Sequence, residues 1–279
     1  MSRTAANNGK TRSHVTGRNK MQQTKKLTRR QRRSVQNRVV TAQRMMPTFE
    51  RELLRKRTEE IIRVLNALKG YAPDRMPELA EEMLNESYLK GLYRRLYLGV
   101  GSAIAEMVTA DTVSSKADSS RWEFRLNEFV ENYSGDKIVL VSGTLKEFVR
   151  KQIQLALLEM PEKGIEAQTQ FIYERVLHYW DSVKRWQVRR IVQTEAMEAM
   201  MVGQYESMRE LGIAYQKVWT ATFNNTRPQH IAMDSVAVGQ DEFFILPNGD
   251  KMLYPHDSVH GARAENLINC ACGTYDLPI

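Results

Sequence analysis

The chain has 279 residues, of which 42% are hydrophobic and 27% charged, a composition typical of a globular protein with one large domain or two. No apolar run reaches membrane-spanning length and no apolar segment follows Met1, so neither a membrane protein nor a secretory leader is expected. Two cysteines do not suggest a disulfide scaffold, and five scattered histidines do not form a His-rich metal tract.

The formal charge of +8 is distributed very unevenly. Residues 1–49 contain 13 Lys or Arg and no Asp or Glu, whereas the remaining chain has 28 basic and 33 acidic residues, a formal charge of −5. Residues 1–48 also lack aromatic side chains and have few apolar ones. Such a segment cannot bury enough surface to offset its chain entropy. We therefore predict a flexible basic arm over 1–48, disordered alone and able to become helical from about Thr28 when a partner neutralises it.

The arm is a candidate binding segment for phosphate. Its lysines and arginines would displace condensed counterions from double-stranded DNA, and the missing aromatic residues argue against stacking on single-stranded bases. An acidic protein surface would attract the same charges, and an import signal or a ribosomal tail would have a similar composition. The candidate contact residues are Lys25, Lys26, Arg29, Arg30, Arg32, Arg33 and Arg38.

The region 49–211 is predicted to be a helical domain. Apolar residues at helical spacing indicate a first helix from Phe49 that ends before Gly70 and Pro73. A second helix of about 30 residues is expected over 79–108. Gly99 and Gly101 would either interrupt this helix or let another helix approach closely.

Three further segments complete the predicted helical domain. Residues 111–120 form a polar loop, and a short helix follows from Trp122 to about Gly135. A capping box at Thr144 is expected to open a helix that runs to Met160. From Ile165 the chain is helical to Leu211, either continuously or with a break near Tyr179, and Gly212 has the position of a C-terminal cap.

Residues 212–279 are predicted to form a small α+β domain. The run 215–221 alternates as a strand, and 236–238 and 243–246 are candidate short strands. Asn248-Gly249 suits a tight hairpin turn, and residues 261–267 form a short helix or loop. The fold class is therefore α+β: a mainly helical body with long helices, a small C-terminal α+β domain and a disordered basic N-terminal arm.

An ordered set of residues near the C-terminus resembles the phage Mu F-like minor head protein family. The set comprises a helix with Arg and Thr-Glu, a Trp strand, an Arg-x-x-His loop, a Phe, a Pro and a closing Asn-Cys-x-Cys. The resemblance covers about Arg190 to Cys272, under a third of the chain. Its residues are Arg190, Thr194, Glu195, Trp219, Arg227, His230, Phe243, Pro255, Asn269, Cys270 and Cys272.

The resemblance implies a structural, non-enzymatic virion protein of a tailed phage or prophage that acts in head morphogenesis. The implied partners are the portal protein, a capsid or scaffold protein and packaged double-stranded DNA. Its location would be the capsid interior of the virion, and the host cytoplasm during assembly. Two alternatives stay open. One is a toxin-like or nucleotide-transferring enzyme domain using Glu195 and Arg190, and the other is a free nonspecific nucleic-acid-binding module acting through 1–48.

The cysteines allow two interpretations. In a turn, Cys270 and Cys272 could chelate one metal ion with His230 as third ligand and His256 or His260 as fourth, a ligand set that favours zinc. The alternative is two reduced cysteines in a small core with no cofactor. Mu F-like domains often carry a first Cys pair where this chain has Arg227-x-x-His230, and a His where it has Leu267. This departure weakens the zinc interpretation.

No catalytic set is recognisable. His230 with Glu195 or Asp234 as partner lacks a nucleophile, and there is no phosphate-binding glycine loop. A buried Glu195 would need a partner, and Arg227 in the following loop is the candidate. We therefore hypothesise a Glu195–Arg227 ion pair that fixes the C-terminal domain on its leading helix, the alternative being an exposed glutamate.

Overall fold

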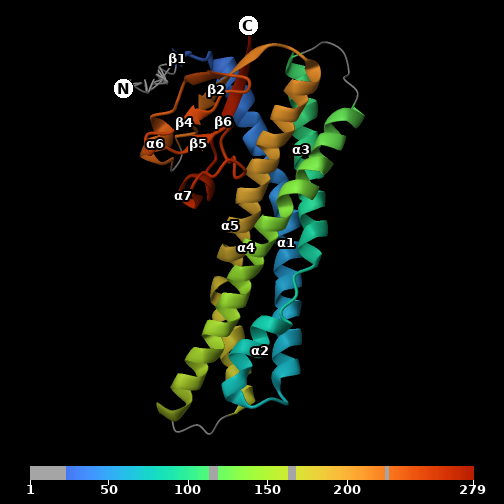
Figure 1. The fold of residues 1–279 in the computed structure, drawn as a ribbon, viewed down its shortest axis with the longest axis vertical. Coiled ribbons are helices and arrows are strands. Elements are labelled where there is room, and N and C mark those ends of the chain that lie inside the picture. The colour runs from blue at the N-terminus through green and yellow to red at the C-terminus, as the bar shows by residue number, and fades with distance from the viewer. Residues whose placement is uncertain (1–22, 113–118, 163–167, 224–225) are drawn as a thin grey trace, which may run out of the picture.

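Long helices form most of the molecule, and a small domain of short strands packs beside one end of them (Figure 1). The computed structural model describes residues 23–112, 119–162, 168–223 and 226–279. The predicted fold class, mainly helical α+β with a small C-terminal domain, is confirmed.

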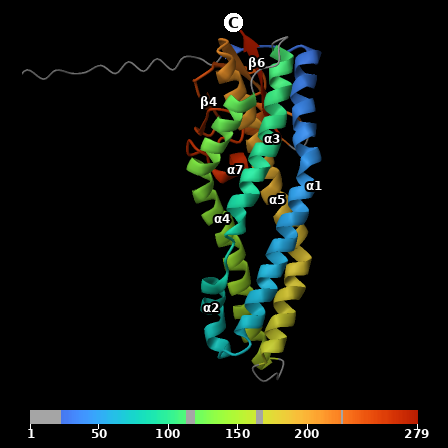
Figure 2. The ribbon, with the colours of Figure 1, turned by 90° about the vertical axis from the view of Figure 1, so that its right-hand side faces the viewer.

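Four long helices run along the molecule side by side, and a short helix packs at the end distant from the C-terminal domain (Figures 1 and 2). None of the helices in the described ranges has the length and apolar character needed to cross a bilayer. The helices are α1 (Arg29–Leu68), α2 (Met76–Met83), α3 (Tyr88–Thr112), α4 (Ser119–Glu162) and α5 (Thr169–Leu211).

The predicted boundary of the basic arm at residue 48 is wrong, because α1 begins at Arg29 and its first half belongs to the core. The Thr28 hydroxyl accepts a hydrogen bond from Gln31 N at 3.3 Å, and Gln31 Oε1 accepts one from Thr28 N at 2.8 Å, which forms a capping box. Val39, Ala42 and Met46, at helical spacing, are buried. Residues 1–22 of the predicted arm lie outside the described residues.

The segment before α1 is bound to the C-terminal domain. Strand β1 (Gln23–Thr24) pairs antiparallel with β3 (Val236–Gly239). Leu27 is buried against Val218 and Ala237. Residues 23–48 are therefore structural, which the count of charges alone did not indicate.

The helix predicted over 79–108 is two helices, because the chain leaves helical geometry between α2 and α3. Leu84 is extended, and Asn85 Oδ1 accepts a hydrogen bond from Ser87 N at 2.9 Å. Such a bond favours a turn over a helix. Gly101 does not interrupt α3 but allows a close crossing: a Cβ on Gly203 of α5 would lie 2.2 Å from Gly101 O.

The helices after residue 118 are longer than predicted. Helix α4 continues through Gly135, and the Thr144 hydroxyl donates to Val141 O at 2.7 Å instead of capping a new helix. Helix α5 passes Tyr179 without a break and ends at Gly212, whose φ of 63° is left-handed, as the sequence predicted. The predicted loop at 111–120 lies largely outside the described residues.

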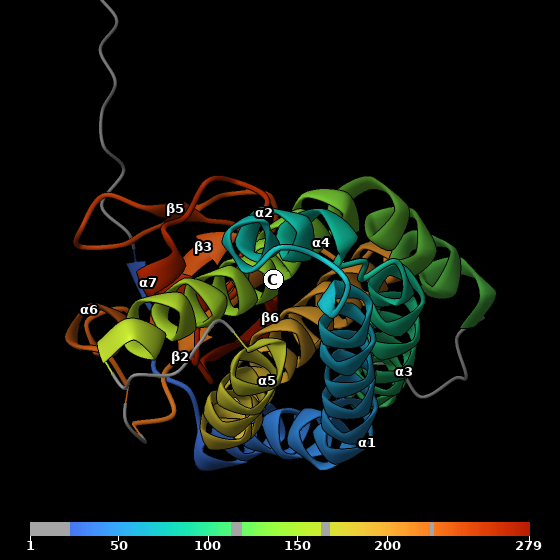
Figure 3. The same ribbon diagram turned by 90° about the horizontal axis from the view of Figure 1, so that it is seen from below.

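The C-terminal domain has a four-stranded antiparallel sheet in the order β1-β3-β2-β6, with a separate β4–β5 hairpin. The strands predicted near 215, 236 and 244 are present, whereas β6 was not predicted. The domain lies to one side of the helices, as the view along them shows (Figure 3). Its further elements are β2 (Tyr215–Thr220), α6 (Pro228–Ile231), β4 (Phe244–Ile245), β5 (Lys251–Met252), α7 (Ala264–Leu267) and β6 (Gly273–Pro278).

Candidate functional site

One histidine and both cysteines of the chain meet inside the C-terminal domain. His230 lies on α6, and Cys270 and Cys272 lie between α7 and β6. His230 Nδ1 is 3.3 Å from Cys270 Sγ and 3.8 Å from Cys272 Sγ. The three potential ligand atoms lie within 4.8 Å of one another, and all three residues are buried. Such a group could hold a metal ion, as the sequence suggested.

Aromatic packing and the loop before α6 hold His230 in place. The Trp219 ring of β2 meets the His230 ring edge-on with centroids 5.5 Å apart, and meets Phe244 at 5.2 Å. Pro228 occupies the first turn of α6, where its missing N–H is not needed. The Arg227 guanidinium donates to Ile268 O, which ties this loop to the segment that carries the cysteines.

A chain of hydrogen bonds fixes the protonation of the His230 ring. Asp250 Oδ2 can only accept, so the Asn266 Nδ2 amide faces it at 2.7 Å. Asn266 Oδ1 then faces His230 Nε2 at 3.1 Å, which requires the proton on Nε2. Nδ1 is therefore the ring nitrogen that faces the two cysteines. Metal-binding histidines usually have this kind of support on the other ring nitrogen.

The two thiols differ strongly in acidity. A hydrogen bond with Cys272 lowers the pKa of Cys270 well below its usual value, with burial opposing and the charge of His256 assisting. The same bond, together with burial, raises the pKa of Cys272. Both cysteines are free. Cys270 is therefore the thiolate of the pair and the better metal ligand.

His256, which the sequence offered as a fourth ligand, lies outside the group of three residues whose ligand atoms are within 4.8 Å of one another. Only 1% of its surface is exposed, and neither ring nitrogen has a hydrogen-bond partner among the described residues. Burial lowers the pKa of His256, but the charge of Cys270 and the further influence of Cys270, Glu198 and Cys272 together outweigh burial, so the pKa of His256 is raised. His260, the other candidate from the sequence, is instead paired with Asp257 at 2.7 Å.

The hypothesised Glu195–Arg227 pair is wrong, because Glu195 has other partners. The Tyr97 hydroxyl donates to Glu195 Oε2 at 2.9 Å, and Lys137 Nζ of α4 lies 3.5 Å from the same oxygen. Lys137 also pairs with Glu198, which accepts a hydrogen bond from the Ser258 hydroxyl at 2.7 Å. Burial raises the pKa of Glu195, although Lys137 opposes this. This buried cluster links α3, α4 and α5 with the C-terminal domain.

Two of the predicted DNA-binding cations have intramolecular roles. Arg32 binds Asp234 through two hydrogen bonds of 2.9 and 2.8 Å, and Arg38 is only 3% exposed. The Arg32 bond lowers the pKa of Asp234 despite partial burial, so Asp234 is a structural carboxylate and not a partner of His230. The other predicted cations are exposed: Lys25, Lys26, Arg29, Arg30 and Arg33.

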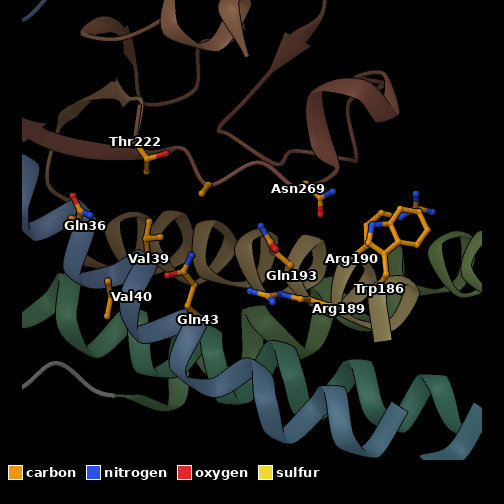
Figure 4. Close-up of a pocket in the computed structure, with 11 residues that line it drawn as sticks. Gln36, Val39, Val40, Gln43, Trp186, Arg189, Arg190, Gln193, Thr222 and Asn269 are labelled. Carbon is orange, nitrogen blue, oxygen red and sulfur yellow. The ribbon is translucent and has the colours of Figure 1, made fainter. Parts of the chain in front are cut away.

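The remaining residues of the family resemblance lie on α5 and beside a cleft. The Thr194 hydroxyl donates to Arg190 O at 2.8 Å, and Asn269 N approaches that hydroxyl at 3.4 Å. Arg190 and Asn269 line the cleft together with Trp186 (Figure 4). The structure therefore gathers Trp219 and the potential metal ligands in one core, and places Arg190, Thr194 and Asn269 outside it.

Three important residues were not singled out from the sequence. Asn266 orients His230, but an isolated asparagine in a polar segment gives no signal of that role. Lys137 and Glu198 form the buried ion cluster with Glu195. The spacing of Glu195 and Glu198, three residues apart on one face of an apolar helix, could have indicated a shared cation.

Comparisons of the chain with protein families, with curated proteins and with solved structures find no match.

Proposed function

We propose that the chain is a minor head protein of a tailed phage or prophage, a structural component that acts in head morphogenesis. The observation that carries this proposal is the meeting of four of the resemblance residues, Trp219, His230, Cys270 and Cys272, in one buried core. His230 lies beside Trp219 and contacts Cys270, 40 residues further along the chain. A shared structural motif requires residues far apart in the sequence to meet, and these four residues do.

A non-enzymatic role is supported by the environment of the polar residues. The enzyme alternative uses Glu195 and Arg190, and a deep pocket around Glu195, His230 and Arg227 would favour it. Glu195 is instead bound to Tyr97 and Lys137 inside the helical bundle. Arg227 donates to a backbone carbonyl, as described above.

The proposed partners are the portal protein, a capsid or scaffold protein and double-stranded DNA within the virion. The exposed cations between Lys25 and Arg33 follow β1, at the end of the molecule that carries the C-terminal domain (Figure 1). No carboxylate occurs in residues 1–49 to neutralise them locally. They suit a phosphate backbone or an acidic protein surface.

The test compares the full chain with two variants. One begins at Gln23, and the other carries Arg29→Gln, Arg30→Gln and Arg33→Gln. Both keep Arg32 and α1, so the fold is preserved. Incorporation into purified head particles is measured by mass spectrometry, and DNA affinity is measured across salt concentrations.

We expect the full chain in the particles. We also expect both variants to show weaker DNA binding and a shallower salt dependence, because each lost phosphate contact reduces the slope. Absence of the full chain from particles would contradict the head-protein proposal. Unchanged DNA binding in both variants would contradict the proposed role of the basic segment.

A second candidate function, zinc binding, is favoured by the geometry of the histidine–cysteine cluster. We propose that Cys270, Cys272 and His230 hold a zinc ion, with the unpartnered His256 as fourth ligand. Thiolate and imidazole are the ligands that zinc prefers, and such an ion contributes folding free energy. It would anchor the segment before β6 to α6.

The zinc proposal is tested on reduced protein by metal analysis and thermal unfolding. We expect one zinc per chain, and a lower Tm after chelation. His256→Gln should weaken retention, whereas the matched variant His260→Gln should not, because His260 pairs with Asp257. Failure of the unaltered chain to retain zinc, or an equal loss in both variants, would refute this ligand set.

A further inference from the structure

A cleft of about 500 Å³ lies between α1, α5 and two segments of the C-terminal domain. Gln36 and Gln43 reach it from α1, while Thr222 and Asn269 approach from the opposite side (Figure 4). Clefts between domains with volumes of roughly 300–1,000 Å³ are the usual sites for small ligands. The cleft is separate from the histidine–cysteine cluster, none of whose residues lines it.

The electrostatics of the cleft favour an anion. Arg189 and Arg190 line it, and no lining residue carries a carboxylate. Among the described residues, neither arginine has an ion pair. Two unpaired guanidinium groups beside one cavity suit a phosphate, which guanidinium binds through charged hydrogen bonds.

An exposed aromatic ring adjoins these charges. Trp186 is 59% exposed, although the chain's other tryptophans, Trp122, Trp180 and Trp219, are buried. The Arg190 guanidinium lies 4.5 Å from the centre of the Trp186 ring, which holds the indole at the edge of the cleft. The exposed indole offers a flat aromatic face that suits stacking with a planar ring.

Four of the other polar side chains that line the cleft distinguish between anionic ligands. Gln36, Gln43, Gln193 and Asn269 are all carboxamides, each with donors and an acceptor. A carboxylate-rich peptide would use only the donors, whereas the edge of a nucleobase offers both kinds of group. The combination of phosphate-binding charge, stacking surface and amides is therefore more typical of nucleotide recognition.

We propose that this cleft binds a nucleotide, either free or as a unit of a single-stranded nucleic acid, with the phosphate at Arg189 and Arg190 and the base near Trp186. This goes beyond the proposed head function, in which DNA is contacted by the N-terminal cations. The two proposals can fail separately. A head protein whose cleft binds no nucleotide would contradict only this inference, and a nucleotide-binding protein that is absent from head particles would contradict only the head function.

The test uses tryptophan fluorescence of the full chain, because Trp186 is the exposed indole and reports on the cleft itself. The titrants are adenosine monophosphate, a short oligothymidylate, adenosine and inorganic phosphate. We expect the nucleotide or the oligonucleotide to quench the emission. Adenosine and phosphate alone should bind at least tenfold more weakly, about 1.4 kcal/mol. Tighter binding of the oligonucleotide identifies a strand as the ligand, and equal binding identifies a free nucleotide.

Variants test the assignment of the phosphate. Arg189→Gln and Arg190→Gln should each weaken nucleotide binding about tenfold, the loss of one charged contact. Arg185→Gln is the matched control, because Arg185 is exposed on the same helix but does not line the cleft. Circular dichroism confirms that each variant is folded. The proposal is overturned if no nucleotide quenches the emission, if phosphate alone binds as tightly, or if all three variants behave alike.

Discussion

The crossing of α3 and α5 can be tested by adding a single carbon atom. In Gly203→Ala the new Cβ would lie 2.2 Å from Gly101 O and 2.7 Å from Gly101 Cα. Those atoms are backbone, so relief requires the two helices to move apart by roughly 1.2 Å to reach an ordinary contact of ~3.4 Å. Overpacking of this kind costs about 1–3 kcal/mol, and the better helix propensity of alanine returns up to ~1 kcal/mol. We expect a net loss of about 1–2 kcal/mol.

Gly143→Ala is the matched control for this substitution. Gly143 is exposed on α4, and a Cβ there would meet no atom within 4 Å. Only the helix-propensity term applies, so this variant should gain up to ~1 kcal/mol. Urea unfolding followed by circular dichroism at neutral pH measures both variants. Equal stabilities for Gly203→Ala and Gly143→Ala would refute the close helix contact.

Three further predictions concern buried charges, each measured by urea unfolding at several pH values. Burial raises the pKa of Asp276 from 3.8 to about 6, so the free energy of unfolding falls as the pH rises through that range. Asp276→Asn should remove this loss, which is on the order of 3 kcal/mol at pH 7. The same variant should make no difference at pH 4. Burial lowers the pKa of Lys217 from 10.5 to about 8, so stability rises with pH above 8, and Lys217→Met should abolish that rise. Lys137→Met leaves Glu195 and Glu198 buried without their cation and should cost roughly 3–5 kcal/mol at neutral pH, less in acid. For Asp276→Asn and Lys217→Met, a pH dependence identical to that of the unaltered chain would contradict the prediction. For Lys137→Met, an unchanged urea midpoint would contradict it.

Hydrophobic spacing predicted most of the helices because it is a local property. Val39, Ala42 and Met46 repeat at helical spacing before residue 48, but the surrounding charges led to the prediction of a disordered arm. The error arose because the partner of Arg32 is Asp234, 202 residues away. Partners at such separations neutralise a basic segment in the fold without leaving any trace in its local composition.

For the candidate site, too, the sequence indicated which residues could bind a metal but not which residues hold them in place. Cys270, Cys272 and His230 were identified as possible ligands because few other side chains bind zinc so well. Their support was not predictable, since Asn266 acts through Asp250 and a particular amide orientation. The Glu195–Arg227 hypothesis failed for a related reason. The cation beside Glu195 is Lys137 of α4, whose Nζ lies 3.5 Å from Glu195 Oε2. Lys137 belongs neither to the resemblance motif nor to the stretch between Glu195 and Arg227.

The C-terminal domain carries the resemblance motif, but its sheet cannot be completed without the start of the chain. β1 supplies the strand next to β3, and Leu27 covers Val218. On the other side, Gln204 of α5 donates to Thr274 O at 3.0 Å in β6. The sheet is thus fixed to the helices at both edges, through the chain that continues from β1 into α1 and through the hydrogen bonds of Gln204.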